Sequence, residues 1–318
     1  MSATTTLLPC GHEVLDPEQV HYCEYIQDPL IKELLLPKAP GGAARAYAHP
    51  DEFQFILVHQ SCELSFAGCL YELERAVEAI QGRDLPRAAA LVGRCRSWLL
   101  LAARQLQHLV DHLTPEDFAY FRVHLSPASG AESIRFRLVE IASGVRPDAP
   151  YVRHRGRTFT FREFLDRGPV VGEGRPKTRW WTSEMEARAA RPTLSSAADA
   201  LFGVAGRPEE EQVAALSAVW RGERGEEARG LAEALYGYER AVRAIRRVHL
   251  NAARRHVSES PGTGHTDGVL YLRSVLETAR SFPALTAAAE RAGAAAESAY
   301  DHDLGAEREG RGGREGGA

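Results

Sequence analysis

The stretch from Asp51 to Gln81 constrains this chain most, because its apolar residues recur at the spacing of one helix face. Within it, the run FQFILVHQSCE carries one histidine, His59, at the end of an apolar segment and directly before polar residues. An imidazole buried without a hydrogen-bonding partner costs roughly 2–7 kcal/mol. The stretch therefore predicts a long amphipathic helix whose histidine needs a partner or an occupant beside it.

Helical spacing recurs along most of the chain, so the predicted fold class is all-α. A second long helix is expected from Leu85 to His112, and Thr114 followed by Pro115 has the composition of a helix start. Further helical stretches are expected at residues 28–36, 132–143 and 269–292, and several helices are expected at 208–257. Pro29 is expected to cut the first of them.

Composition divides the chain into segments. Between Gly144 and about Pro192, arginine, glycine and proline dominate and short alternating runs replace the helical ones. This part is expected to be a small insertion with little core of its own. The expected boundaries are 1–50 for an N-terminal segment, 51–144 for the first helices, 145–205 for the insertion, 206–303 for the C-terminal helices and 304–318 for a disordered tail.

Charge and cysteine content exclude several classes of protein. The formal net charge of -4 provides no basic field for nucleic acid, and no apolar run approaches the roughly 18–20 residues that span a bilayer. The N-terminal residues lack the pattern of a signal peptide. The five cysteines form no CxxC pair, and Cys62 and Cys69 fit reduced positions in a core. We expect a cytoplasmic protein without nucleic-acid or membrane partners.

Arg122 is a candidate for recognising a carboxylate. It follows Phe118 by four residues, which places both on one face of a helix. A guanidinium offers a rigid fork for a carboxylate, and this pairing is strongest in a dry pocket. The ordinary alternative for Arg122 is a structural ion pair with Glu116 or Asp117.

His249 stands on an arginine-rich helix, with Arg246 and Arg247 before it and Arg254 and Arg255 after it. From the residues alone, a surface histidine among solvated arginines is the ordinary interpretation. A neutral imidazole on a helix can also bind iron through one ring nitrogen while the other finds an acceptor. The surrounding arginines would then either steer haem propionates or remain solvated.

Three motifs follow one another along the chain. They are FxxxHQxxEL at Phe55–Leu64, LTPxDFxxFRxxLxPASGxxSxxFRxxE at Leu113–Glu140, and HxxxxxxHV with GTG and YLR at His249–Arg273. Together they resemble the tryptophan 2,3-dioxygenase family of histidine-ligated haem oxygenases, most weakly at residues 145–200. The resemblance implies an all-α helical bundle of that type with a small inserted subdomain. It also implies haem b, dioxygen as co-substrate, a tryptophan-like amino acid as substrate and a homotetramer.

The resemblance assigns the haem-facing roles. His249 falls where the family carries the axial ligand of the haem iron, fourteen residues before Thr263. Ser129 and Gly130, in the ASG motif, are expected to contact the cofactor. His59 matches the histidine that faces the indole nitrogen, and Thr263 resembles the loop residue that helps hold the ammonium and carboxylate of the substrate.

The same resemblance assigns the substrate-binding roles. Arg122 would bind the carboxylate, Phe118 would pack on the indole, and Phe55 would form an apolar wall of the pocket. Tyr22 and Tyr25 match an N-terminal YxxY segment that reaches into a neighbouring subunit's pocket in that family. Helix-packing tyrosines are the alternative for this pair.

The chain departs from the family pattern in the lid loop. It reads GTGHTDG where the family usually reads GTGGSSG, which introduces His265 and Asp267. These side chains would change hydrogen bonding and water access near the bound oxygen. Ring cleavage of tryptophan or a substituted tryptophan to an N-formylkynurenine-type product is the favoured interpretation, in a biosynthetic branch. A monooxygenase of secondary metabolism that forms an oxindole or a hydroxylated aromatic amino acid, a non-catalytic haem sensor, and a helical scaffold are the alternatives.

Overall fold

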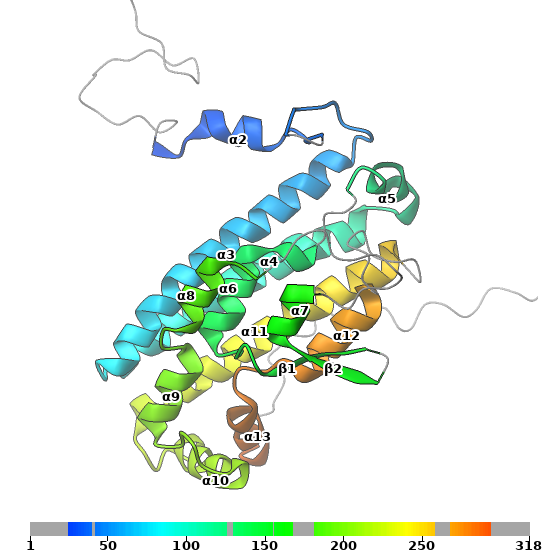
Figure 1. Cartoon of the computed structure of the whole chain (residues 1–318). Helices are drawn as coiled ribbons and strands as arrows, with labels where there is room; N and C mark the ends of the chain where they lie inside the picture. The colour runs from blue at the N-terminus through cyan, green and yellow to red at the C-terminus, as the bar shows by residue number, and fades with distance from the viewer. Residues whose placement is uncertain are drawn as a thin grey trace, which may run out of the picture. The chain divides into compact units, whose positions relative to one another are not determined.

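The structure, a computed structural model, describes residues 25–39, 42–125, 130–154, 156–167, 181–257 and 268–293. It contains two compact units, Met1–Leu57 and Val58–Ala318. Within the described residues every element is helical apart from one two-stranded antiparallel sheet and one isolated bridge, which confirms the expected all-α class (Figure 1). No helix among them is both long and apolar enough to cross a bilayer.

In the first unit, the short helix α2 (Asp28–Leu34) forms where one was expected, but the prediction that Pro29 cuts it is wrong. Pro29 stands in the first turn, where a backbone N–H would have no partner inside the helix, so proline is tolerated there. The Tyr47 hydroxyl then donates to the Leu35 carbonyl at 2.7 Å and ties the following loop to the helix end.

A buried carboxylate marks the start of α3 (Glu52–Gln81), whose bounds confirm the first predicted helix. Glu52 is only 1% exposed and accepts a hydrogen bond from the Ala48 N–H at 2.8 Å. It also pairs with the Arg45 guanidinium, whose Nη1 lies 2.9 Å from one carboxylate oxygen. A negative charge at this position is favoured by the helix dipole.

The second unit is built on long helices. α4 (Leu85–His112) has the predicted bounds and runs parallel to α11 (Glu226–His256). The two helices are close enough at Gly237 that an added Cβ would lie 3.3 Å from the Arg96 side chain. At the C-terminal ends of the two helices, the His256 ring is hydrogen-bonded to the Leu113 carbonyl at 2.9 Å.

The part of α3 that follows Leu57 runs antiparallel to α4, and thiols lie between the two helices. The Cys62 thiol donates to the Ala102 carbonyl, and the Cys95 thiol donates to the Cys69 carbonyl, both at 3.6 Å. These three cysteines are buried and free, which agrees with the reduced core positions predicted for Cys62 and Cys69.

Hydroxyl groups fix the starts of the next helices. α5 (Pro115–Arg122) begins as predicted, with the Thr114 side chain accepting from the Asp117 N–H at 3.1 Å. A short 3₁₀ turn, η1 (Gly130–Glu132), precedes α6 (Ile134–Ser143). The helix predicted from residue 132 starts two residues later, because the Ser133 side chain caps it by accepting from the Phe136 N–H at 3.3 Å.

The expected insertion contributes to the core of the long helices. Its elements are β1 (Pro150–His154), β2 (Arg157–Thr160), α7 (Phe161–Arg167) and α8 (Ser183–Ala189), followed by α9 (Leu194–Phe202). Tyr151, Phe161, Phe164 and Met185 are fully buried in one cluster with side chains of α6, α11 and α12 (Gly268–Thr278). The apolar residues of this segment therefore pack on one another and on neighbouring helices.

The predicted helix 269–292 is wrong, since the structure has two helices there, α12 and α13 (Pro283–Arg291). Pro283 begins α13, and a proline disfavours helical geometry in the residue before it. Between these two helices, side chains of α11 form hydrogen bonds with backbone groups. Arg246 Nη1 donates to the Ala279 carbonyl at 2.5 Å, and Glu239 accepts from the Ser281 N–H at 3.2 Å. α13 packs on α10 (Glu209–Trp220).

Gly144 should be the least replaceable helix-ending glycine among the described residues of the second unit. Its φ is +126°, and an added Cβ would overlap Ser195 Oγ. We expect Gly144→Ala to lower the free energy of unfolding by about 2–5 kcal/mol, from backbone strain and overpacking together.

Gly203→Ala is the matched control for that substitution. Gly203 also ends a helix with positive φ, +64°, but its added Cβ would meet no atom within 4 Å. Only strain of about 1–2 kcal/mol is expected there. Denaturant unfolding of both variants measures the difference, and equal losses would contradict the predicted clash.

Candidate functional site

Two histidines from distant parts of the sequence interact electrostatically in the second unit. His59 stands on α3 and His249 on α11, and both are half-buried. Enclosure of His249 by protein is the main cause that lowers its pKa, and the nearby His59 and Arg137 add to it by disfavouring a second positive charge. Together these causes lower the pKa from 6.5 to about 4. His249 is therefore neutral at physiological pH.

Gly130 lies against the ring of His249. A Cβ added to Gly130 would be 3.5 Å from both Cε1 and Nε2 of the imidazole, so a side chain at this position would fill space beside the ring nitrogen. Among the described residues, neither nitrogen of His249 has a hydrogen-bonding partner. A neutral imidazole with a free ring nitrogen has the chemistry that ligation of haem iron requires, so the residues present fit this cofactor.

Contacts between α3 and α6 hold the segment that carries His59. Glu63, one turn after His59, accepts a hydrogen bond from the Ser133 hydroxyl and lies 3.5 Å from Arg135. The rings of Phe66 and Phe136 pack one turn further along, with centroids 5.0 Å apart. The first turn of α6, which follows Gly130 closely in the chain, is therefore attached to the helix of His59.

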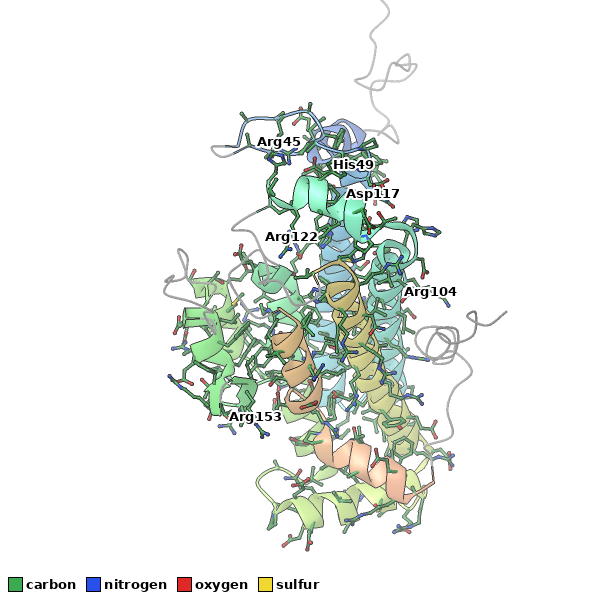
Figure 2. All side chains as sticks on the ribbon, turned by 90° about the vertical axis from the view of Figure 1, so that its right-hand side faces the viewer. Arg45, His49, Arg104, Asp117, Arg122 and Arg153 are labelled. Atoms are coloured by element: carbon green, nitrogen blue, oxygen red, sulfur yellow. The ribbon has the colours of Figure 1, made fainter. Side chains whose placement is uncertain are left out.

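The α5 helix carries Phe118 and Arg122. Phe118 is buried and packs edge-on against Phe121 and His256, with ring centroids 5.3 Å and 5.6 Å away. Arg122 is the last residue of α5 and half-buried, and Figure 2 shows it on the same short helix as Asp117. His256 thus links α5, through Phe118, to the end of the helix that carries His249.

The sequence patterns did not predict a role for His256 or Glu63. Both stand inside the quoted motifs, but no role was assigned to either. Both ring nitrogens of His256 face carbonyl oxygens, those of Ala252 and Leu113, each at 2.9 Å. The spacing of His256, seven residues after His249, placed the two on one side of the helix and was the available signal.

The expectation that Arg246 is solvated or steers propionates is wrong. Its side chain is 5% exposed, and its guanidinium is bound to Glu140 at 2.6 Å. Arg247, Arg254 and Arg255 are exposed. The difference follows from helix geometry, since Arg246 faces the core while the other three face away from it.

Two further predicted site residues lie in the first unit. Phe55 is half-buried on α3 and belongs to the first unit, as does Tyr25, which is 80% exposed. Predictions on Tyr22, Ser129, Thr263, His265, Asp267 and the tail concern positions outside the described residues.

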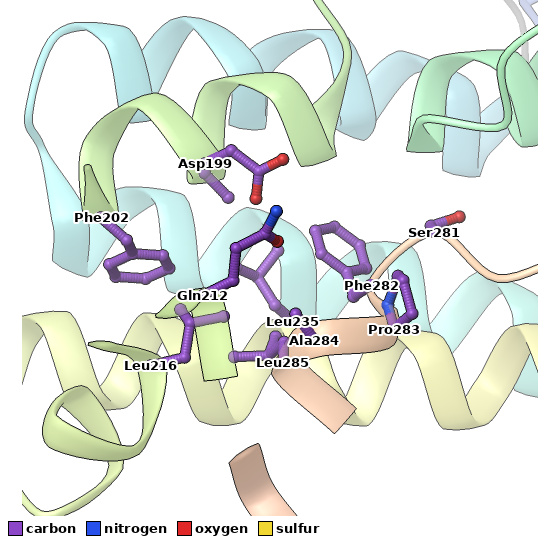
Figure 3. A pocket seen from close by; sticks show the side chains of 11 residues that line it. Asp199, Phe202, Gln212, Leu216, Leu235, Ser281, Phe282, Pro283, Ala284 and Leu285 are labelled. Atoms are coloured by element: carbon purple, nitrogen blue, oxygen red, sulfur yellow. The ribbon is translucent and has the colours of Figure 1, made fainter. Parts of the chain in front are cut away.

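A cavity of about 110 Å³ lies elsewhere in the second unit, among α9, α10, α11 and the start of α13 (Figure 3). Asp199, Gln212 and Ser281 supply its polar groups, and burial raises the pKa of the Asp199 carboxyl. None of its lining residues is cationic. A carboxylate in this wall would repel the carboxylate of an amino acid, so the cavity is a poor candidate for the substrate site.

Comparisons with known proteins point to one family. A family profile described as Tryptophan 2,3-dioxygenase matches residues 10–173. A tryptophan 2,3-dioxygenase of a Nocardioides species is 31% identical over 243 residues, which cover 71% of this chain and 80% of that protein. The enzyme of that name from a Bradyrhizobium species is 28% identical, over 81% of this chain and 88% of its own length. That of Geobacillus thermodenitrificans is 27% identical, over 83% of this chain and 89% of its own length.

A helical protein with a neutral histidine suited to iron is thus similar, over most of its length, to haem enzymes. The chain belongs to the tryptophan 2,3-dioxygenase family. It is accordingly a haem-dependent dioxygenase, with haem iron as its cofactor and dioxygen as its co-substrate.

The lowered pKa of His249 predicts how haem binding depends on pH. Because the folded apoprotein protonates this imidazole only near pH 4, its nitrogen stays available for iron between about pH 8 and about pH 5. We expect haemin affinity, titrated by Soret absorbance, to be nearly constant over that interval and to fall near pH 4. A midpoint near 6.5 would contradict the prediction.

The same shift affects stability. Between pH 6.5 and about 4 the unfolded chain carries the His249 proton and the folded chain does not, so this contribution to stability is lost as pH falls through that window. Far-UV circular dichroism at each pH separates loss of haem affinity from unfolding. His249→Ala should give no Soret change at any pH.

Proposed function

We propose that this chain opens the indole ring of L-tryptophan, or of a substituted tryptophan, with dioxygen to give an N-formylkynurenine-type product. The observation that carries the proposal is the approach of His59 to a neutral His249, with Gly130 against the ring of His249. Within the part of the chain that the structure describes, this ring has no hydrogen-bonding partner. Membership of the tryptophan 2,3-dioxygenase family supports the same reaction.

His249 is the proposed axial ligand of the haem iron. Its neutral state supports this role, because a protonated imidazole cannot donate its ring nitrogen to a metal. When bound, haem supplies the binding of dioxygen and the oxidation itself. The protein contributes orientation of the substrate and exclusion of water.

His59 is the proposed partner of the indole nitrogen. An imidazole nitrogen that accepts the indole N–H would fix the ring relative to the haem and hold the proton at that atom. The attachment of its helix to α6 through Glu63 and Ser133 supports a fixed position for this side chain. A positioned hydrogen bond of this kind lowers the barrier mainly by orientation.

The proposed clamp for the amino-acid part of the substrate is Arg122 together with Thr263. The guanidinium would bind the carboxylate with two parallel hydrogen bonds, and Phe118 would contribute an apolar surface to the indole. Phe55 is the proposed wall of the same pocket. Tyr25, with 80% of its surface exposed, is available for contact with a neighbouring subunit.

A homotetramer in the cytoplasm is the proposed state of the protein. Large apolar side chains are exposed along the second-unit part of α3 and on α4, and this supports association of copies. They are Leu64, Tyr71, Trp98 and Leu101, exposed by 74%, 64%, 37% and 44%. Sedimentation velocity of the holoprotein tests the state, and a monomer would contradict it.

Product analysis with labelled oxygen tests the proposed reaction. Ferrous haem-loaded protein is mixed with ¹⁸O₂ and L-tryptophan, then with a panel of ring-substituted tryptophans. We expect a product that carries two labelled oxygen atoms and has the absorbance of an N-formylkynurenine. A product with one labelled atom would instead identify a monooxygenase, and no turnover of any indole would contradict an oxygenase role.

Arg122→Ala tests the carboxylate clamp. Losing charge-assisted hydrogen bonds should lower kcat/KM for L-tryptophan about a hundredfold, while turnover of tryptamine, which lacks the carboxylate, should change little. Arg229→Ala is the control, because Arg229 forms an exposed pair with Glu233 at 2.9 Å on α11. Equal losses for both substrates would show that Arg122 does not bind the carboxylate.

A further inference from the structure

A polar network of five residues is buried in the core of the second unit. Its members are Arg137, Glu140, Tyr151, Arg246 and Tyr271, and each is at most 5% exposed. They come from four elements, namely α6, β1, α11 and α12. Buried charges on this scale are destabilising unless they are paired and hydrogen-bonded.

Glu140 is the centre of the network. It accepts from Arg137 at 2.5 Å and from Arg246 at 2.6 Å, while the Tyr151 hydroxyl lies 2.8 Å and 3.0 Å from its two oxygens. Arg137 also donates to the Tyr271 hydroxyl at 3.1 Å. Burial raises the pKa of Tyr151 and Tyr271, so both hydroxyls keep their protons.

The network is joined to the turn of α11 that carries His249. Arg246 precedes His249 by three residues, so the two side chains lie on neighbouring turns of the same side of the helix. Arg246 is held at two points, by Glu140 and by the Ala279 carbonyl at 2.5 Å. A rotation of α11 that moved His249 would have to break both contacts.

The network also holds the two elements on either side of that turn. Arg137 and Glu140 belong to α6, whose N-terminal end lies close to Gly130, the residue beside the His249 ring. Tyr271 stands in the first turn of α12, and its ring stacks on Phe164 with centroids 4.6 Å apart. The ligand helix is therefore fixed relative to α6 and α12 by side-chain bonds that contact no proposed substrate group.

We propose that this network, centred on Glu140, is the positioning element of the haem ligand: it fixes the rotation of α11 and so the direction of the His249 ring. The inference rests on the proposed ligation of haem by His249. Residues that orient a metal ligand typically change metal affinity or activity by about 10–100-fold when replaced, without touching the metal.

Substitution of two network tyrosines tests whether the network positions His249 or only stabilises the fold. Tyr271→Phe and Tyr151→Phe each remove one network hydroxyl and keep the ring that packs in the core. Tyr238→Phe is the matched control, because Tyr238 is also fully buried, stands on α11 itself and bonds Ser143 at 2.6 Å, outside the network. All three variants lose one buried hydroxyl.

The decisive measurement is the iron–histidine band in the resonance Raman spectrum of ferrous haem-loaded protein. We expect the iron–histidine band to shift or broaden in Tyr151→Phe and Tyr271→Phe, with haem affinity about tenfold weaker. Tyr238→Phe should leave both unchanged while losing comparable stability. Glu140→Gln, which keeps the shape of the side chain, should give the largest change of the series.

The possible failures are distinguishable. If the wild-type protein gives no iron–histidine band, or if His249→Ala keeps it, the proposed ligation fails and this inference fails with it. If the wild-type band is present and the network and control variants behave alike, ligation by His249 stands and the positioning role is overturned.

Discussion

The second unit depends on the burial of Arg246 against Glu140 inside its core. Two charges removed from water are tolerated only with close pairing and further hydrogen bonds, and here Arg137, Tyr151 and the Ala279 carbonyl supply them. Losing one partner would leave an unpaired buried charge, at a cost of about 3–5 kcal/mol. The pair therefore joins α11 to α6 through the core.

His249 and His256 gain different properties from their places on this one helix. His249 is neutral and has no hydrogen-bonding partner among the described residues, which suits a nitrogen intended for iron. His256 has a carbonyl oxygen at each nitrogen and an aromatic ring beside it, which suits a structural link between α11, α4 and α5. Two histidines of one motif thus differ in hydrogen bonding because their surroundings differ.

Much of the secondary structure followed from the sequence. The bounds of α4 and the Thr114 cap were predicted because they depend on local spacing and on a side chain bonding its own helix. The break between α12 and α13 was not, since the carbonyl and N–H groups it frees are bound by Arg246 and Glu239, which are distant in sequence. Local patterns do not show which distant side chain will satisfy an interrupted backbone.

The sequence by itself determined the fold class, the family and the candidate residues, because helix periodicity and motif order are properties of the chain. Only the tertiary structure decided that Arg246 is a core residue and that His59, Gly130 and His249 come together. The physical reason is that burial and electrostatic environment depend on neighbours from several elements. A motif gives the identity of a side chain, whereas its charge state and its partners depend on the packing around it.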